Sequence, residues 1–144
     1  MGCRVSLDDE KGRMTITKHF KFYAAHRNEE IGGKCASIHG HRYGVAVTIE
    51  EPRNGSITML FDDIEKRVKP LLDRLDHSLL LHTSDPARDT LLSSGACCRV
   101  YEVPFPTSAE NMAEHILSEL RATGLNVVEL ALQETDTSIV TVKP

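Results

Sequence analysis

Apolar and polar residues alternate along residues 14–26, which is the pattern of a strand with one buried face. One face of this stretch, in which Lys18 is the single misfit, consists of Met14, Ile16, Phe20, Phe22, Ala24 and His26. A second alternating stretch covers about residues 39–50. Its corresponding face consists of His39, His41, Tyr43, Val45, Val47 and Ile49. Because side chains alternate along a strand, the pattern predicts two strands whose buried faces carry histidines at one end.

The middle of the chain is less regular. A loop over residues 27–38 separates the two predicted strands, and a short strand is expected over about residues 56–60. Apolar residues at helical spacing then predict a helix over about residues 62–75, which Pro70 is expected to kink or interrupt. Residues 78–106 show no pattern that favours one kind of element.

The C-terminal part is again regular. The segment Thr107-Ser108-Ala109-Glu110 has the form of a capping box, and it opens a second predicted helix that ends at Gly124. Two final strands, about residues 127–134 and 137–142, are close enough to form a hairpin. The order strand–strand–helix–helix–strand–strand indicates an α+β fold.

Length and charge restrict the classes of protein. A chain of 144 residues predicts a single domain, here over residues 13–144 behind a polar tail of residues 1–12. The net charge of −4 gives no electrostatic reason to expect nucleic acid or an anionic membrane as partner. We find no apolar run of transmembrane length, no signal peptide and no cysteine spacing typical of disulfides, so we expect a cytoplasmic protein.

The histidines form the strongest chemical signal. His39 and His41 project from one face of a predicted strand, and His26 on the neighbouring strand can complete a set of three nitrogen ligands. Zinc held by three histidines keeps a fourth position open, which is typical of a catalytic site. The alternative is scattered surface histidines, but these would more often lie on the polar faces. Cys35, just upstream of His39, is then a candidate acid/base.

Two further positions suggest a functional role, but each also has a simpler structural explanation. Glu134 lies on the apolar side of its predicted strand, so its carboxylate must contact a partner or a ligand; an interface salt bridge is the simpler explanation. Asp76 and His77 could act as an acid/base pair. They could equally well end a helix, where histidine is favourable against the helix dipole.

Five motifs together resemble the 6-pyruvoyl-tetrahydropterin synthase/6-carboxytetrahydropterin synthase family, in the order that the family has them. They are Phe20-x-Phe22-x-Ala24-Ala25-His26, Cys35-x3-His39-Gly40-His41, Leu75-Asp76-His77, Pro106-Thr107-Ser108-Ala109-Glu110-Asn111 and Glu134-Thr135. The resemblance implies the tunnelling fold, a four-stranded antiparallel sheet with two helices on one face. It also implies that three subunits close their sheets into a barrel and that two trimers stack as a homohexamer.

The resemblance also implies residue roles. The zinc ligands would be His26, His39 and His41; the catalytic residues would be Cys35, Asp76 and His77, with the last two contributed by an adjacent subunit. Glu134 would anchor the pterin, and Thr107 would form a wall of its pocket. The chain departs from the family where Leu60-Phe61 replaces Asp-Phe and where Leu80-Leu81-His82 replaces Leu-Asn-Asp. Arg27, Lys34 and Arg42 could contact a triphosphate, although solvated basic side chains are the commoner case.

The spacing in the second motif favours one reaction. Three residues separate Cys35 from His39, which within the family is typical of queuosine-pathway enzymes. We therefore expect a lyase that converts 7,8-dihydroneopterin triphosphate to 6-carboxy-5,6,7,8-tetrahydropterin, releasing triphosphate and acetaldehyde. The alternatives are a 6-pyruvoyl-tetrahydropterin synthase of the biopterin type and a non-catalytic, zinc-bearing hexamer that binds pterins.

Overall fold

The computed structural model describes residues 12–144, so the predicted tail lies almost wholly outside the described residues. Its centre is a long antiparallel pair of strands, β1 (Arg13–His26) and β2 (His39–Pro52). A short 3-10 turn, η1 (Gly33–Ala36), lies in the loop between them. Both predicted strands are therefore confirmed, and each is slightly longer than its alternating pattern indicated.

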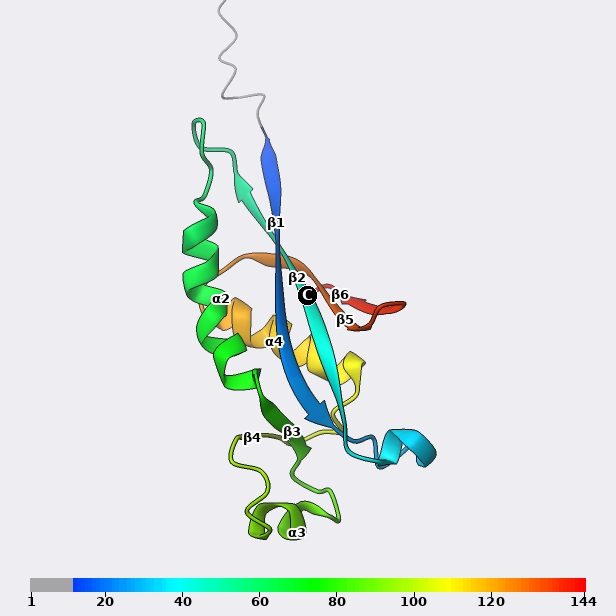
Figure 1. Ribbon diagram of the computed structural model, residues 1–144. Coiled ribbons are helices and arrows are strands. Elements are labelled where there is room, and N and C mark those ends of the chain that lie inside the picture. The colour runs from blue at the N-terminus through cyan, green and yellow to red at the C-terminus, as the bar shows by residue number, and fades with distance from the viewer. Residues whose placement is uncertain (1–11) are drawn as a thin grey trace, which may run out of the picture.

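The sheet has six strands in the order β4-β3-β1-β2-β5-β6, as Figure 1 shows. The C-terminal hairpin, β5 (Val127–Thr135) and β6 (Ser138–Val142), extends the antiparallel part beside β2, as predicted. On the other side, β3 (Ser78–His82) runs parallel to β1, and β4 (Val100–Val103) runs parallel to β3. The expected four-stranded antiparallel sheet is thus wrong: the sheet is mixed, with two additional strands.

The additional strands come from the segment for which the sequence showed no pattern. Leu79, Leu80 and Leu81 in β3 are all buried, so this strand has no alternation to detect. Continuous apolar runs of this kind are typical of parallel strands, which are covered on both faces. A short helix, α3 (Arg88–Ser93), joins β3 to β4.

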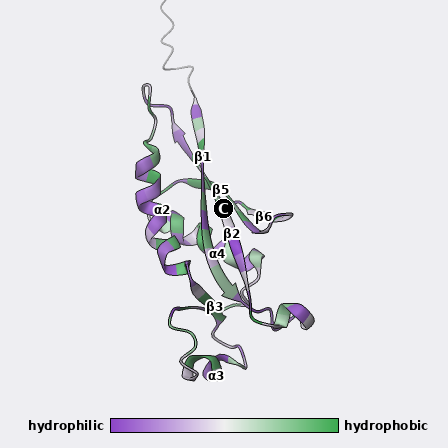
Figure 2. Ribbon diagram, in the orientation of Figure 1, coloured by the Kyte–Doolittle hydropathy of each residue, from purple (hydrophilic) through white to green (hydrophobic). Residues whose placement is uncertain are grey.

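Two longer helices, α2 (Phe61–Leu75) and α4 (Ala109–Ala122), cover one face of the sheet (Figure 1). In Figure 2, hydrophilic and hydrophobic stretches alternate along α2, as expected for a helix with one buried side. The buried residues of the two helices are Ile64, Val68, Leu71, Leu72, Leu75, Met112, Ala113, Ile116, Leu117 and Leu120. They pack against the apolar faces of β1, β2 and β5 and form one core.

Three local expectations need correction. The helix α2 continues through Pro70, which is exposed, so water can satisfy the carbonyl that the proline leaves unbonded. Residues 56–60 form no strand, because no neighbouring strand lies along them to complete a ladder. The N-cap of α4 is Ser108 rather than Thr107, since the Ser108 hydroxyl accepts the hydrogen bond from the Asn111 amide at 3.2 Å.

Within residues 12–144, none of the helices combines the length and the apolar character that a membrane crossing requires.

Candidate metal centre

The register between β1 and β2 brings the three predicted histidines together. His26 pairs with His39, and Ala24 pairs with His41, so all three side chains lie on the face that the helices cover. The ring centroids are 4.8 Å apart for His26 and His39, 5.2 Å for His26 and His41, and 4.8 Å for His39 and His41. One nitrogen from each ring lies within 4.8 Å of the others.

Hydrogen bonds determine which ring nitrogen is available in two of the three histidines, His26 and His39. The Nδ1 of His26 donates to the Thr107 carbonyl at 2.8 Å, and the Nδ1 of His39 donates to the Ser37 carbonyl at 2.7 Å. Because a carbonyl oxygen only accepts, both Nδ1 atoms carry the proton and both Nε2 atoms carry a lone pair. This is the arrangement that holds metal-ligating histidines in a fixed tautomer and orientation.

Two of the Nε2 atoms are buried without a hydrogen-bond partner, those of His26 and His41. The His41 Nε2 lies 3.4 Å from Glu134 Oε1, close enough for electrostatic attraction but without hydrogen-bond geometry. Burial is the main cause that lowers the pKa of His26 and of His41, and the negative charge of Glu134 offsets this only in part. The lowered pKa favours the neutral form of both rings. Neutral imidazoles with inward-facing lone pairs fit a bound metal ion.

Thr107 and Glu134 both belong to this cluster. Thr107 is buried, and besides its contact with His26 its hydroxyl donates to the Arg27 carbonyl at 3.4 Å. Glu134, at the end of β5, is half-buried beside His41. Tyr43, on the same face, was not among the predicted site residues. Its hydroxyl is buried without a partner, and burial raises its pKa.

Cys35 lies in η1, half-buried, with its carbonyl accepting a hydrogen bond from the Asn28 amide at 2.6 Å. This places it in the loop that leads into His39. In the described part of the chain, no hydrogen bond links the Cys35 thiol to the histidine cluster.

Asp76 and His77 form a pair at the end of α2. The Nδ1 of His77 donates to Asp76 Oδ2 at 2.8 Å, and Asp76 Oδ1 accepts from the Tyr23 amide at 2.8 Å. The Tyr23 amide is the main cause that lowers the pKa of Asp76, with the bond from His77 adding to it. His77 has a φ of 57°, and its own amide donates to the Tyr23 carbonyl at 2.6 Å. Two contacts with β1 thus hold this strained backbone in place.

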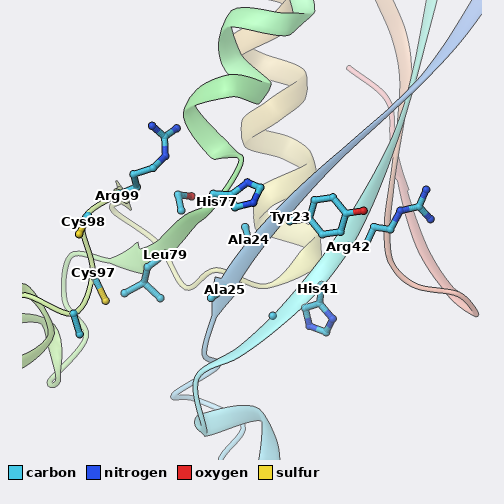
Figure 3. A pocket seen from close by; sticks show the side chains of 13 residues that line it. Tyr23, Ala24, Ala25, His41, Arg42, His77, Leu79, Cys97, Cys98 and Arg99 are labelled. Atoms are coloured by element: carbon cyan, nitrogen blue, oxygen red, sulfur yellow. The ribbon is translucent and has the colours of Figure 1, made fainter.

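The Asp76–His77 pair is separated from the histidine cluster by the sheet. The His77 ring lies beside that of Tyr23, with the centroids 6.1 Å apart. Tyr23 and His26 are three residues apart on β1, so their side chains point to opposite faces. Next to His77 lies an open groove of about 690 Å³, whose lining includes Arg42, Cys97 and Arg99 and also His41 of the cluster (Figure 3).

Comparisons with known proteins agree with this arrangement. The family described as 6-pyruvoyl tetrahydropterin synthase matches residues 15–144. The chain is 31% identical over 107 residues to 6-carboxy-5,6,7,8-tetrahydropterin synthase of Rickettsia conorii, covering 72% of this chain and 78% of that protein. It is 30% identical over 132 residues to the protein of the same name from Haemophilus influenzae, covering 85% and 94%.

Solved structures share the fold. An uncharacterized protein from Wolinella succinogenes has a TM-score of 0.79 and 21% identity, covering 91% of this chain and 98% of that chain. The 6-pyruvoyl tetrahydropterin synthase of Caenorhabditis elegans has a TM-score of 0.67 and 21% identity, covering 92% and 96%.

The geometry predicts that His39 is required for metal retention. We expect the wild-type protein to hold about one metal ion per chain, and His39→Ala to lose it because only two imidazoles remain. Metal content by plasma mass spectrometry measures this. The matched control is His19→Ala, which removes an exposed histidine from the opposite face of β1. A His39→Ala protein with wild-type metal content would contradict the assignment.

The lowered pKa values of His26 and His41 predict a pH dependence of the metal-free protein. Below the ordinary value of 6.5, the unfolded chain binds protons that the folded chain does not. The free energy of unfolding should therefore be highest above pH 6.5 and fall as the pH drops below it. Urea unfolding across this range measures the slope, which should be shallower in His26→Gln. An equal slope in the two proteins would show that His26 contributes nothing to it.

Proposed function

Since this chain belongs to the 6-pyruvoyl tetrahydropterin synthase family, we propose that it is a zinc-dependent lyase acting on 7,8-dihydroneopterin triphosphate. With water as co-reactant, the products are 6-carboxy-5,6,7,8-tetrahydropterin, acetaldehyde and triphosphate, as in the queuosine-pathway members. The observation that carries the proposal is the cluster of three histidines beside the Glu134 carboxylate, in which hydrogen bonds fix the tautomers of His26 and His39. The names of the relatives and the short spacing between Cys35 and His39 support this reaction within the family.

Each polar group near the cluster has a role that its chemistry allows. A pterin presents its N3–H and 2-amino group side by side, and the Glu134 carboxylate can accept both hydrogen bonds. In residues 12–144, Glu134 accepts no hydrogen bond, although its Oε1 lies 3.4 Å from His41 Nε2, so the carboxylate can accept from a ligand. Thr107, buried against His26, borders the pterin pocket. His26, His39 and His41 would hold a zinc ion, which when bound would supply Lewis-acid chemistry toward a substrate oxygen.

Cys35 and the Asp76–His77 pair carry out the proton transfers. Cys35 removes a proton from a carbon of the substrate side chain, and His77 returns a proton, with Asp76 holding its ring in place. This division of roles needs both groups at one site. Within one chain His77 lies beside Tyr23, on the face of β1 opposite to the three histidines, so in this proposal a second copy supplies His77. We therefore propose a homohexamer, a dimer of trimers, whose active sites lie between subunits.

Product analysis tests the reaction. Incubation with dihydroneopterin triphosphate should release acetaldehyde and triphosphate, and Cys35→Ala should abolish both while pterin binding, followed by fluorescence, persists. Mass spectrometry identifies the pterin product. Release of triphosphate without acetaldehyde would instead indicate a 6-pyruvoyl tetrahydropterin synthase. Pterin binding without any turnover by the wild-type protein would indicate a binding protein.

Subunit mixing tests the shared site. Cys35→Ala and His77→Ala are each expected to be inactive, but exchange of their subunits should restore part of the activity, because some interfaces then combine an intact Cys35 with an intact His77. The matched control mixes Cys35→Ala with His39→Ala. Both changes damage the same side of the site, so no interface is complete and activity should stay absent. Mixed hexamers without restored activity, or a fully active monomer, would contradict the proposal.

A further inference from the structure

A second charged cluster lies where the end of β1 meets the turn after β3. The Arg27 guanidinium binds Asp85 through two parallel hydrogen bonds, from Nε to Oδ2 at 2.8 Å and from Nη2 to Oδ1 at 2.6 Å. The Asp85 side chain is 2% exposed and that of Arg27 is 21% exposed. A bidentate pair this well shielded from water holds the guanidinium plane in one orientation.

The remaining nitrogen of the same guanidinium, Nη1, contacts the loop that carries Cys35. Arg27 Nη1 donates to the Ala36 carbonyl at 3.2 Å, while the adjacent Asn28 amide donates to the Cys35 carbonyl at 2.6 Å. None of the four residues of η1 is fully buried, and only Cys35 and Ala36 are half-buried, so packing holds this turn in part at most. Hydrogen bonds to residues 27 and 28 therefore contribute to its position.

The turn after β3 is itself well anchored. Asp85 Oδ1 also accepts a hydrogen bond from the Ala87 amide at 2.8 Å, and the Asp85 amide donates to the His82 carbonyl at 3.0 Å. The bond from Arg27 is the main cause that lowers the pKa of Asp85, so the carboxylate is ionised at neutral pH. A second pair links the same elements, since His82 Nδ1 donates to Glu29 Oε1 at 2.7 Å.

We propose that Arg27 and Asp85 are positioning residues that hold the Cys35 loop in its reactive place beside the histidine cluster. Asp85 orients the guanidinium, and the guanidinium holds the carbonyl next to Cys35. This inference rests on the proposed acid/base role of Cys35. It also gives the segment around β3 a function. Because the Arg27 guanidinium already donates to Asp85 and to the Ala36 carbonyl, it is not free to bind a triphosphate.

The test replaces Asp85 by Asn, which removes the charge and one of the two acceptor oxygens. The matched control is Glu102→Gln, which weakens another arginine–carboxylate pair of the same region, that of Arg88 and Glu102, far in sequence from Cys35. Iodoacetamide labelling, read on the Cys35 peptide by mass spectrometry, reports the freedom of the loop. The exposed Cys98 serves as the internal reference thiol.

We expect Asp85→Asn to speed Cys35 labelling by roughly threefold or more, because the rate follows the population of the opened loop. Hydrogen exchange of the Asn28 amide should accelerate in parallel. With dihydroneopterin triphosphate, kcat should fall by about tenfold while KM changes by less than about twofold, since Asp85 does not contact the substrate. Glu102→Gln should leave labelling, exchange and kinetics unchanged.

Arg27→Lys provides a second variant if Asp85→Asn does not fold. Lysine keeps the positive charge opposite Asp85 but lacks the fork that also reaches Ala36, so the same changes at Cys35 are expected. Wild-type labelling and exchange rates in these variants would overturn the inference. The labelling and exchange measurements need no turnover. Failure of the proposed reaction would therefore appear as a wild-type protein without product, independently of the result at Cys35.

Discussion

The site depends above all on the register of the antiparallel ladder between β1 and β2. Its 14-residue strands pair from Arg13 with Pro52 to His26 with His39. A shift by one residue would turn every side chain of one strand to the other face, which would separate His39 and His41 from His26. The apolar residues along the same faces exclude this shift, because it would expose them to water. The core therefore determines the geometry of the histidine cluster.

The histidines are also held by parts of the chain far away in sequence. Thr107, whose carbonyl accepts from His26, immediately precedes Ser108, the N-cap of α4. The start of that helix and the orientation of the His26 ring are thus determined together. A buried polar atom without a partner costs about 1–3 kcal/mol, and the free Nε2 atoms of His26 and His41 both carry this cost. A bound metal ion would offset it, which couples metal binding to the stability of the fold.

The segment that adds β3 and β4 to the sheet connects the two sides of the site. Where it begins, Asp76 and His77 bond to the backbone of Tyr23 on β1. Where β3 ends, Asp85 binds Arg27, which follows His26 directly. These contacts anchor both ends of the β3 strand to β1 and its end. They also hold the Asp76–His77 pair beside Tyr23 and connect β3, through Arg27, to the carbonyl of Ala36 next to Cys35.

Local periodicity was sufficient to predict β1, β2, both long helices, the C-terminal hairpin and the faces that carry His26, His39, His41 and Glu134. It succeeded because each of these elements buries one face and exposes the other, so its own sequence carries the pattern. It failed for β3, which is covered on both faces, and for residues 56–60, where apolar residues find no partner strand. Likewise, nothing local identifies Asp85 as the partner of Arg27 or Thr107 as the acceptor for His26. These contacts join residues 58 and 81 positions apart, so only the packing of the folded chain could decide them.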